Sequence, residues 1–224
     1  IARNLELDRT VFDYIARVRT TRLVYPSSSA VYPLHLQEGE GARALEEADV
    51  DFTSGRLGVP DNTYGWVKLT AEFTASLVRP HIEAPIVVYR PFSVYGPGQA
   101  EDYPVTAIAR RVLARADPLV VWGSGQQVRD FVHIEDFLRI VLGTYRTTAG
   151  TAPLNIATGI PVSFAELASE MARIRGYRPT VAPRAEMPAG VAYRVGCPAS
   201  IPLDLAPRTP LNGGLRSVLD WLAA

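Results

Sequence analysis

Residues 22–32 read Arg-Leu-Val-Tyr-Pro-Ser-Ser-Ser-Ala-Val-Tyr, an apolar run that stops at a proline and three consecutive serines. The run Arg22–Tyr25 predicts a short buried strand, with Ser27, Ser28 and Ser29 at its carboxyl end. Serines at such a position donate hydrogen bonds to a substrate hydroxyl or carbonyl; ordinary turn residues are the structural alternative. A second apolar run, Ile86–Tyr89, is continuous and is typical of a strand covered on both faces.

Helical patterns alternate with these strands along the whole chain. Apolar spacing predicts further strands at 119–122 and 154–157, and helices near 4–17, 64–79, 106–114, 137–145, 164–175 and 211–222. A capping box formed by Ser163 and Glu166 starts one of these helices, and Gly176 ends it. Residues 33–63 are polar and predict a long loop used as a lid or for binding. Alternating strands and helices predict parallel α/β layers with ligands at the carboxyl ends of the strands.

Composition excludes several classes of protein. The chain has 224 residues, 23 basic and 23 acidic side chains, and is 47% hydrophobic, which predicts a folded globular protein and argues against a nucleic-acid or acidic-membrane partner. Its longest apolar runs have about four residues, whereas a bilayer span needs about 20. The single cysteine, Cys197, excludes a disulfide framework and a cysteine-built metal site. We expect an intracellular, cytoplasmic enzyme without a metal ion.

Tyr64 and Lys68 lie four residues apart in a predicted helix, so the phenol and the ammonium share one face. A free phenol has a pKa of about 10, and a neighbouring cation favours the phenolate, so the pair predicts a tyrosine that acts as base and acid near neutral pH. Lys68 is the only lysine among the 23 basic residues, which indicates a position that needs a compact ammonium. The structural alternative is an aromatic ring and a snorkelling lysine on a helix surface.

A series of ordered stretches together resembles one family. In chain order they are 27–32 (SSSAVY), 64–68 (YGWVK), 90–99 (RPFSVYGPGQ), 123–136 (GSGQQVRDFVHIED), 154–159 (LNIATG) and 194–196 (RVG). The chain resembles the extended short-chain dehydrogenase/reductases, and within these the NAD-dependent epimerase/dehydratase family that acts on nucleotide sugars. The resemblance covers nearly the whole chain and implies an α/β fold. This fold has a Rossmann-like parallel sheet with helices on both faces and a smaller C-terminal α/β substrate domain.

The resemblance also implies how the chain is divided and how it assembles. Residues 1–92 and 130–160 would form the C-terminal part of the NAD-binding domain, and residues 93–129 and 161–224 the nucleotide-sugar-binding domain. The helices at 4–17 and 64–79 resemble the family's dimer-forming pair, so a homodimer is expected.

For catalysis and cofactor binding, the resemblance assigns Tyr64 as the acid/base on the sugar hydroxyl. Lys68 would hold the nicotinamide ribose and lower the pKa of the tyrosine. Ser28, with Ser29 beside it, would hydrogen-bond the same sugar oxygen. Ser27 and Pro91 complete the expected contacts with NAD.

For the substrate, a nucleotide-diphosphate sugar, the resemblance assigns Arg129 and Arg194 as a clamp on the diphosphate, a bidentate role that suits guanidinium. Ser93, Val121 and Gln99 are the other expected substrate contacts. For either arginine alone, a solvated or Asp130-paired surface residue is the alternative. His133 is expected to be a structural hydrogen-bonding residue, because the three histidines lack metal-ligand spacing.

Several departures from the family pattern bear on the reaction. Members that dehydrate the sugar carry a carboxylate just after the catalytic Ser or Thr, and 3,5-epimerases carry a cysteine there; this chain has Ser29 and Ala30. Ser93 stands where the family usually has Asn, and Cys197 where it has Asp after Arg-x-Gly. The 36 positions from Ser28 to Tyr64 exceed the usual spacing, which predicts an unusual substrate lid.

The family's glycine-rich dinucleotide loop does not occur in residues 1–224. Residue 1 is isoleucine, and the only methionines are Met171 and Met187, so we expect that an N-terminal part carrying this loop precedes Ile1. These residues alone are then expected to bind NAD poorly, and the complete protein to bind it well.

The sequence therefore predicts an NAD-dependent nucleotide-sugar epimerase that inverts C4 through a transient 4-keto sugar. Within the family, a dehydratase (4,6 or 5,6) or a 4-ketoreductase remains an alternative. A truncated, non-catalytic nucleotide-sugar-binding protein is the alternative from another class.

Overall fold

The computed structural model describes residues 1–18, 22–147 and 152–224. The helices are α1 (Ala2–Arg17), α2 (Asn62–Val78), α3 (Pro104–Leu113), α4 (Ile134–Thr144), α5 (Phe164–Ile174) and α6 (Leu211–Ala223). The strands are β1 (Leu23–Pro26), β2 (Ile86–Pro91), β3 (Ser93–Tyr95), β4 (Leu119–Trp122), β5 (Val128–Arg129), β6 (Phe131–His133), β7 (Leu154–Ile156), β8 (Val162–Ser163), β9 (Val181–Arg184) and β10 (Tyr193–Arg194).

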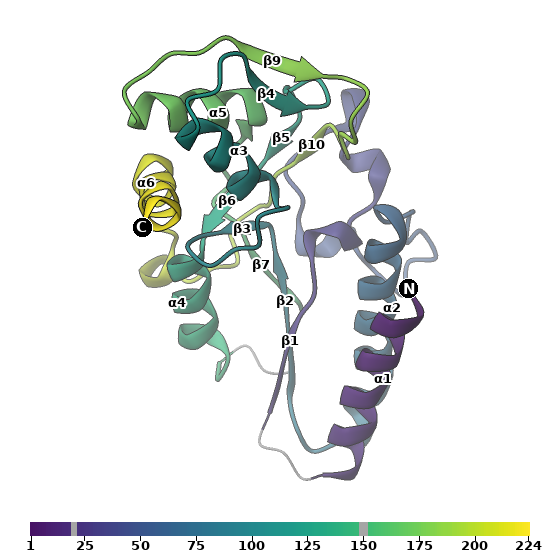
Figure 1. The fold of residues 1–224 in the computed structure, drawn as a ribbon. Helices are drawn as coiled ribbons and strands as arrows, with labels where there is room; N and C mark the ends of the chain where they lie inside the picture. The colour runs from purple at the N-terminus through teal and green to yellow at the C-terminus, as the bar shows by residue number, and fades with distance from the viewer. Residues whose placement is uncertain (19–21, 148–151) are drawn as a thin grey trace.

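A parallel sheet in the order β1-β2-β7 forms the centre of the lower half of the molecule (Figure 1). Its middle strand, β2, is buried along almost its whole length, as the continuous apolar run predicted. Ile86 and Val88 pack with Phe12 of α1 and Ala75 of α2, whereas Val87 and Tyr89 pack in a second cluster on the other face. Because successive strand residues point to opposite faces, one apolar run supports both layers.

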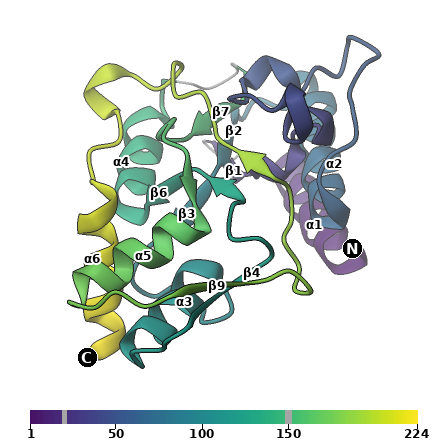
Figure 2. The same cartoon turned by 90° about the horizontal axis from the view of Figure 1, so that it is seen from above.

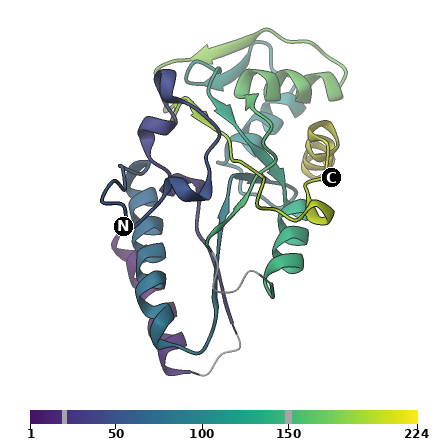
Figure 3. The ribbon, with the colours of Figure 1, turned by 180° about the vertical axis from the view of Figure 1, so that it is seen from behind.

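Helices therefore cover both faces of this sheet. Helices α1 and α2 lie side by side on one face, and α4 lies on the other (Figures 1 and 3). The predicted parallel sheet with helices on both faces is confirmed.

The upper half has its own apolar core between α3, α5, α6 and the two-stranded parallel sheet β4–β9 (Figure 2). Strand β4 occupies the predicted residues but is buried on one face only. Leu119 and Val121 are buried, whereas Trp122 is 46% exposed, because β4 pairs only with β9 and helices cover a single face of this pair. The division of the chain into two domains at residues 93 and 130 remains a prediction.

Small strands and a long segment connect the two halves. The sequence predicted a long loop over residues 33–63; in the structure the segment before α2, residues 33–61, makes three short 3₁₀ turns and lies along β10. The amide of Tyr193 donates to the Gln37 carbonyl (3.0 Å), the amide of Leu45 to the Val195 carbonyl (2.9 Å) and the amide of Cys197 to the Leu45 carbonyl (2.8 Å). The long spacing between Ser28 and Tyr64 thus forms a packed strap against the strand that carries Arg194.

Local signals predicted the helix ends well. The capping box of Ser163 and Glu166 opens α5 as expected, and Gly176 has the positive φ of 73° typical of a residue after a helix. Helix α2 begins two residues earlier than predicted, after Asp61. Asp61 occupies the cap position, yet its carboxylate caps nothing because it pairs with Arg194 instead.

A buried ion pair joins α2 to β2. Arg90 donates to both carboxylate oxygens of Glu72, at 2.6 to 3.2 Å, and the two side chains are 1% and 2% exposed. The Ser27 hydroxyl also donates to Glu72, and Arg90 further donates to the Tyr32 hydroxyl and the Glu47 carbonyl. One carboxylate therefore ties the end of β1 and the end of β2 to the helix between them.

Glu72→Gln is expected to destabilise the fold by about 3–5 kcal/mol, because it leaves the Arg90 guanidinium buried without its counter-charge. Chemical denaturation of the variant and the unaltered protein measures this difference. Glu170→Gln is the matched control, since Glu170 pairs with the largely exposed Arg173 on α5 and its loss is expected to cost less than about 1 kcal/mol. Equal effects of the two substitutions would contradict the expected role of the buried pair.

Candidate active site

A cavity of about 470 Å³ opens at the carboxyl ends of β1 and β2. Parallel strands end on the same edge of a sheet, so the serines after β1, the segment after β2 and the first turn of α2 meet there. Nine of the eleven site residues predicted from the sequence line this cavity: Ser27, Ser28, Ser29, Tyr64, Pro91, Ser93, Gln99, Arg129 and Arg194. The structure brings these residues together, and their individual roles remain predictions.

Val121 does not fit its predicted role as a substrate contact. Its side chain is 1% exposed and lies in the apolar core of the upper half, because alternation along β4 turns it inward. The next residue, Trp122, faces outward and lines a second cavity.

Lys68 lies one helical turn beyond Tyr64, just outside the lining of the cavity. Its ammonium donates to the Pro26 carbonyl (2.9 Å) and to the Tyr25 hydroxyl (3.2 Å), and Tyr25 in turn donates to the Asp8 carboxylate (2.9 Å). Burial lowers the pKa of Lys68, and the nearby carboxylates of Asp8 and Glu72 oppose this shift. An ammonium carries three donors, so one N–H remains for a bound molecule.

The pKa of Tyr64 is raised above its ordinary value, which differs from the lowered pKa expected from the sequence. Burial is the largest cause, the neighbouring phenol of Tyr103 adds to it, and a hydrogen bond with Ser28 acts in the opposite direction. The Lys68 ammonium lies 5.9 Å from the centre of the Tyr64 ring and is directed toward Tyr25 and Pro26. The raised pKa favours the protonated form of the Tyr64 phenol.

The two arginines that were predicted to clamp the diphosphate both line the cavity, and they differ in their hydrogen-bond partners. Arg194 donates from Nε to Gln37 Oε1 (2.6 Å) and from Nη2 to the Asp61 carboxylate (2.7 Å). The Arg194 and Asp61 side chains are only 11% and 18% exposed, so this ion pair is largely shielded from water. Burial lowers the pKa of Arg194, and the contact with Asp61 opposes the shift.

Arg129, in contrast, has no ion pair with a carboxylate among the residues that the structure describes. Main-chain carbonyls of Val128 and Val191 accept its hydrogen bonds at 2.8 Å, and its guanidinium lies 5.6 Å from the centre of the Phe164 ring. Burial first, and the nearby Arg194 second, lower the pKa of Arg129 to about 10. A half-buried guanidinium at a cavity wall, without a carboxylate in direct contact among the described residues, favours binding of an anion. Its neighbour Asp130 is not its partner but accepts hydrogen bonds from Thr158 and Gly159.

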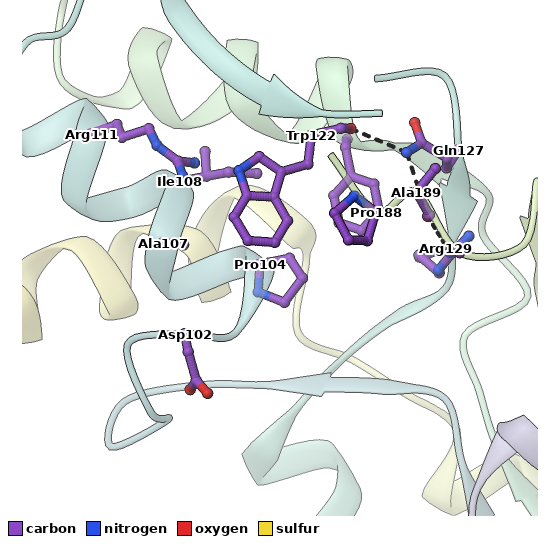
Figure 4. A pocket seen from close by; sticks show the side chains of 12 residues that line it. Asp102, Pro104, Ala107, Ile108, Arg111, Trp122, Gln127, Arg129, Pro188 and Ala189 are labelled. Atoms are coloured by element: carbon purple, nitrogen blue, oxygen red, sulfur yellow. Dashed lines mark hydrogen bonds between the residues drawn. The ribbon is translucent and has the colours of Figure 1, made fainter. Parts of the chain in front are cut away.

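A second cavity of about 540 Å³ shares Pro104, Arg129 and Phe164 with the first. Figure 4 shows the indole of Trp122 projecting into its middle, between Arg111 and Arg129. Gln127 is fixed there by hydrogen bonds to the Trp122 and Ala189 carbonyls. The two cavities therefore lie next to each other, with the Arg129 side chain lining both.

Tyr103, Trp122 and Asp61 were not predicted from the sequence as site residues. Tyr103 lines the first cavity and lies directly before α3. Trp122 is the last residue of β4, and the serines directly follow β1. The rule that ligands bind at the carboxyl ends of strands could therefore have identified Trp122 as well. For Asp61, the sequence indicated only a residue at the start of helix α2.

The described residues, 1–18, 22–147 and 152–224, contain no group of three His, Cys, Asp or Glu side chains that could hold a metal ion. His133 has the structural role that the sequence predicted, since it caps α4 by accepting from the Glu135 amide and contacts the Ser217 hydroxyl. Within the same ranges, every helix is too short or too polar to cross a membrane.

Comparison with known families and proteins gives one family match and several relatives. The family model described as the NAD dependent epimerase/dehydratase family matches residues 1–157. A dTDP-4-dehydro-6-deoxy-D-allose reductase of a Streptomyces species is 32% identical over 167 residues, which is 72% of this chain and 50% of the relative. A putative GDP-L-fucose synthase of Oryza sativa subsp. japonica is 26% identical over 97% of this chain and 64% of the relative. The chain thus spans about half to two thirds of the length of these curated relatives.

Solved structures share the fold over nearly the whole chain. MoeE5 in complex with UDP-glucose and NAD superposes with a TM-score of 0.80 at 29% identity, over 98% of this chain and 71% of that one. The UDP-glucuronic acid 4-epimerase of Bacillus cereus, in complex with UDP-glucuronic acid and NAD, gives a TM-score of 0.80 at 24% identity, over 98% of this chain and 67% of that one.

Ser28→Ala is expected to raise the pKa of Tyr64 further, because it removes the one hydrogen bond that favours the phenolate. NMR titration of protein labelled at the tyrosine ζ carbon measures this, with a Tyr64→Phe sample to assign the resonance. Ser29→Ala is the matched control, since Ser29 is not among the causes of the shift. An unchanged or lowered pKa in Ser28→Ala would contradict the proposed contact.

Proposed function

The chain belongs to the NAD-dependent epimerase/dehydratase family, and from this premise we propose that it catalyses NAD-dependent epimerisation at C4 of a nucleotide-diphosphate sugar through a transient 4-keto sugar. The observation that carries the proposal is the chemistry of the cavity wall. Tyr64 and Ser28 line the cavity together, and its described wall contains no carboxylate, histidine or cysteine.

The side chains that line the cavity limit the reactions that it can catalyse. Dehydration and epimerisation beside a ketone both require a group that removes a proton from carbon. Ser29 and Ala30 are both buried where such a group would lie, and neither is able to act as this base. Proton exchange at a hydroxyl, by contrast, needs only one acid/base, and Tyr64 supplies it. The intact pair of Tyr64 and Ser28 also argues against a purely binding role.

NAD is the cofactor of this family, and the residues present fit its nicotinamide end. Lys68 retains one free N–H for the ribose, and Ser27 and Pro91 line the cavity at the strand ends. When bound, NAD supplies the acceptor and donor of the C4 hydride.

The residues of the chain handle the proton. Ser28 donates a hydrogen bond to the substrate O4 and holds it against Tyr64. Tyr64 takes the O4 proton as the ketone forms and returns it when the alcohol is restored. Since burial raises the pKa of Tyr64, the acid step is favoured as the site stands, and the base step depends on the positive charge of Lys68.

The two adjoining cavities support an elongated substrate. The sugar occupies the cavity beside Tyr64, the diphosphate lies at Arg129 and Arg194, and the nucleoside occupies the cavity beside Trp122. A clamp on the diphosphate holds the substrate while the sugar ring turns over, so that hydride returns to its other face.

A 4-ketoreductase of a nucleotide-linked 4-keto sugar is the second candidate. The reductase that is 32% identical to this chain supports this reaction. The raised pKa of Tyr64 supports it as well, because it favours the protonated phenol that a reductase needs as proton donor. The two reactions share every residue assigned above and differ in whether the reduced cofactor is consumed.

We also propose a homodimer formed through α1 and α2. Leu7, Val11 and Tyr14 give α1 an exposed apolar face, and Trp66, Phe73 and Leu77 give α2 another. The two helices pack side by side (Figure 3), and in the proposed dimer a second copy of the chain covers these exposed apolar side chains.

Tyr64→Phe in the full-length protein is expected to abolish turnover and leave the fold intact, because it removes a single hydroxyl. Incubation of UDP-, dTDP- and GDP-sugars with NAD, followed by NMR of the C4 configuration, tests the epimerase. Stoichiometric consumption of NADH or NADPH with a 4-keto sugar would establish the reductase instead. A 4-keto-6-deoxy or unsaturated product, or full activity in Tyr64→Phe, would overturn the proposal.

Leu77→Glu is expected to convert the dimer into a monomer at micromolar concentration, because it places a charge within the apolar surface. Light scattering coupled to size-exclusion chromatography measures the mass. Leu203→Glu is the control, since Leu203 is 93% exposed and lies on a turn packed near α4 rather than on α1 or α2. A monomer in the unaltered protein would remove the proposed interface.

A further inference from the structure

The cavity beside Tyr64, where the sugar is proposed to bind, has few positively charged side chains in its described lining. Arg129 and Arg194 are the two cationic side chains among the described residues that line the cavity beside Tyr64. The rest of the described wall consists of hydroxyl, amide, aromatic and aliphatic groups, such as Ser93, Phe92 and Val105. Both arginines lie where the diphosphate is proposed to bind.

Asp61 already neutralises one of these cations. Its carboxylate accepts from Arg194 at 2.7 Å, in a pair that is largely shielded from water. Two guanidinium groups and one carboxylate leave a single net positive charge. A nucleotide-sugar diphosphate, with one negative charge on each phosphate, more than balances it.

Gln99 adds a second constraint on the ligand. Its Nε2 donates to the Val94 carbonyl (2.9 Å), which fixes the orientation of the amide, and its Oε1 is buried without a hydrogen-bond partner. A buried acceptor of this kind is satisfied by a donor such as a sugar hydroxyl. An ionised carboxylate only accepts hydrogen bonds, so a sugar carboxylate placed against Gln99 would leave its Oε1 unsatisfied.

A uronic acid would therefore bring a third anion into a cavity with no cation left to pair with it. An unpaired charge removed from water is costly, and Asp61 adds like-charge repulsion. A neutral sugar brings hydroxyl groups that match the serines and Gln99, and apolar faces that match the aromatic side chains.

We propose that this site selects nucleotide sugars with an uncharged sugar over nucleotide uronic acids, and that Asp61 sets this selectivity by neutralising Arg194. The inference rests on the proposed function, because it assumes that the diphosphate occupies both arginines. It separates this chain from MoeE5, which has been solved with UDP-glucuronic acid as well as with UDP-glucose.

Calorimetry on the NAD-loaded, full-length protein tests the inference. UDP, dTDP and GDP are titrated first, and the sugar pair is then measured on the nucleotide that binds: UDP-glucose against UDP-glucuronate, dTDP-glucose against dTDP-glucuronate, or GDP-mannose against GDP-mannuronate. The neutral sugar is expected to bind at least about tenfold more tightly than its uronate. Equal or tighter binding of the uronate overturns the inference and leaves the proposed function standing. Failure of all three nucleotides to bind overturns the proposed function and the inference with it.

Asp61→Asn tests the residue itself. The variant is expected to bind the uronate more tightly and so to reduce the preference for the neutral sugar about tenfold, because Arg194 regains an unbalanced charge. Asp51→Asn is the matched control, since Asp51 lies on the same strap, hydrogen-bonds within its own turn and does not line the cavity. An unchanged preference in a folded Asp61→Asn protein overturns the role of Asp61. Should this variant not fold, the comparison on the unaltered protein still decides whether the site rejects uronates.

Discussion

The carboxylate of Glu72 is the constraint on which the site depends. It accepts from Ser27 at the end of β1 and from Arg90 at the end of β2, and it lies on α2 below Lys68 and Tyr64. Residues 64, 68 and 72 recur at intervals of four, so they share one side of the helix. Fixing Glu72 against the strand ends therefore fixes the rotation of α2, and with it the side on which the phenol and the ammonium emerge. A buried ion pair adds little net stability compared with apolar packing, and its value here is the single geometry that it imposes.

The parts of the fold and site that could be predicted are those with local signals. Hydrophobic period and run length located β2 and the helices, the Ser163–Glu166 box located the start of α5, and the positions after two parallel strands located the serines and Pro91. The rule that parallel strands end on one edge placed the serines and Pro91 together, whereas the pairing of Ser28 with Tyr64, 36 positions away, was implied by the family resemblance.

The parts that escaped prediction depend on partners distant in sequence or on the direction of a side chain. Asp61 and Arg194 are 133 residues apart, and no local pattern shows that a helix-cap residue would pair with a strand arginine instead. Val121 and Trp122 are neighbours on β4, and which of them faces the site was decided by the helices that cover one face of that strand. The direction of the Tyr64 pKa shift likewise depends on burial, which a sequence does not state.

The surroundings of Lys68 bear on the acid/base role proposed for Tyr64, whose pKa is raised. Tyr25 stands between the two charges: its hydroxyl accepts a hydrogen bond from the Lys68 ammonium and donates one to the Asp8 carboxylate. Burial disfavours the charged form of Lys68. The Asp8 carboxylate favours it from the far side of the Tyr25 side chain. A carboxylate paired directly with the ammonium would largely cancel the electrostatic effect of the Lys68 charge on Tyr64. The phenol of Tyr25 prevents such direct pairing in this structure, as the proposed acid/base role of Tyr64 requires.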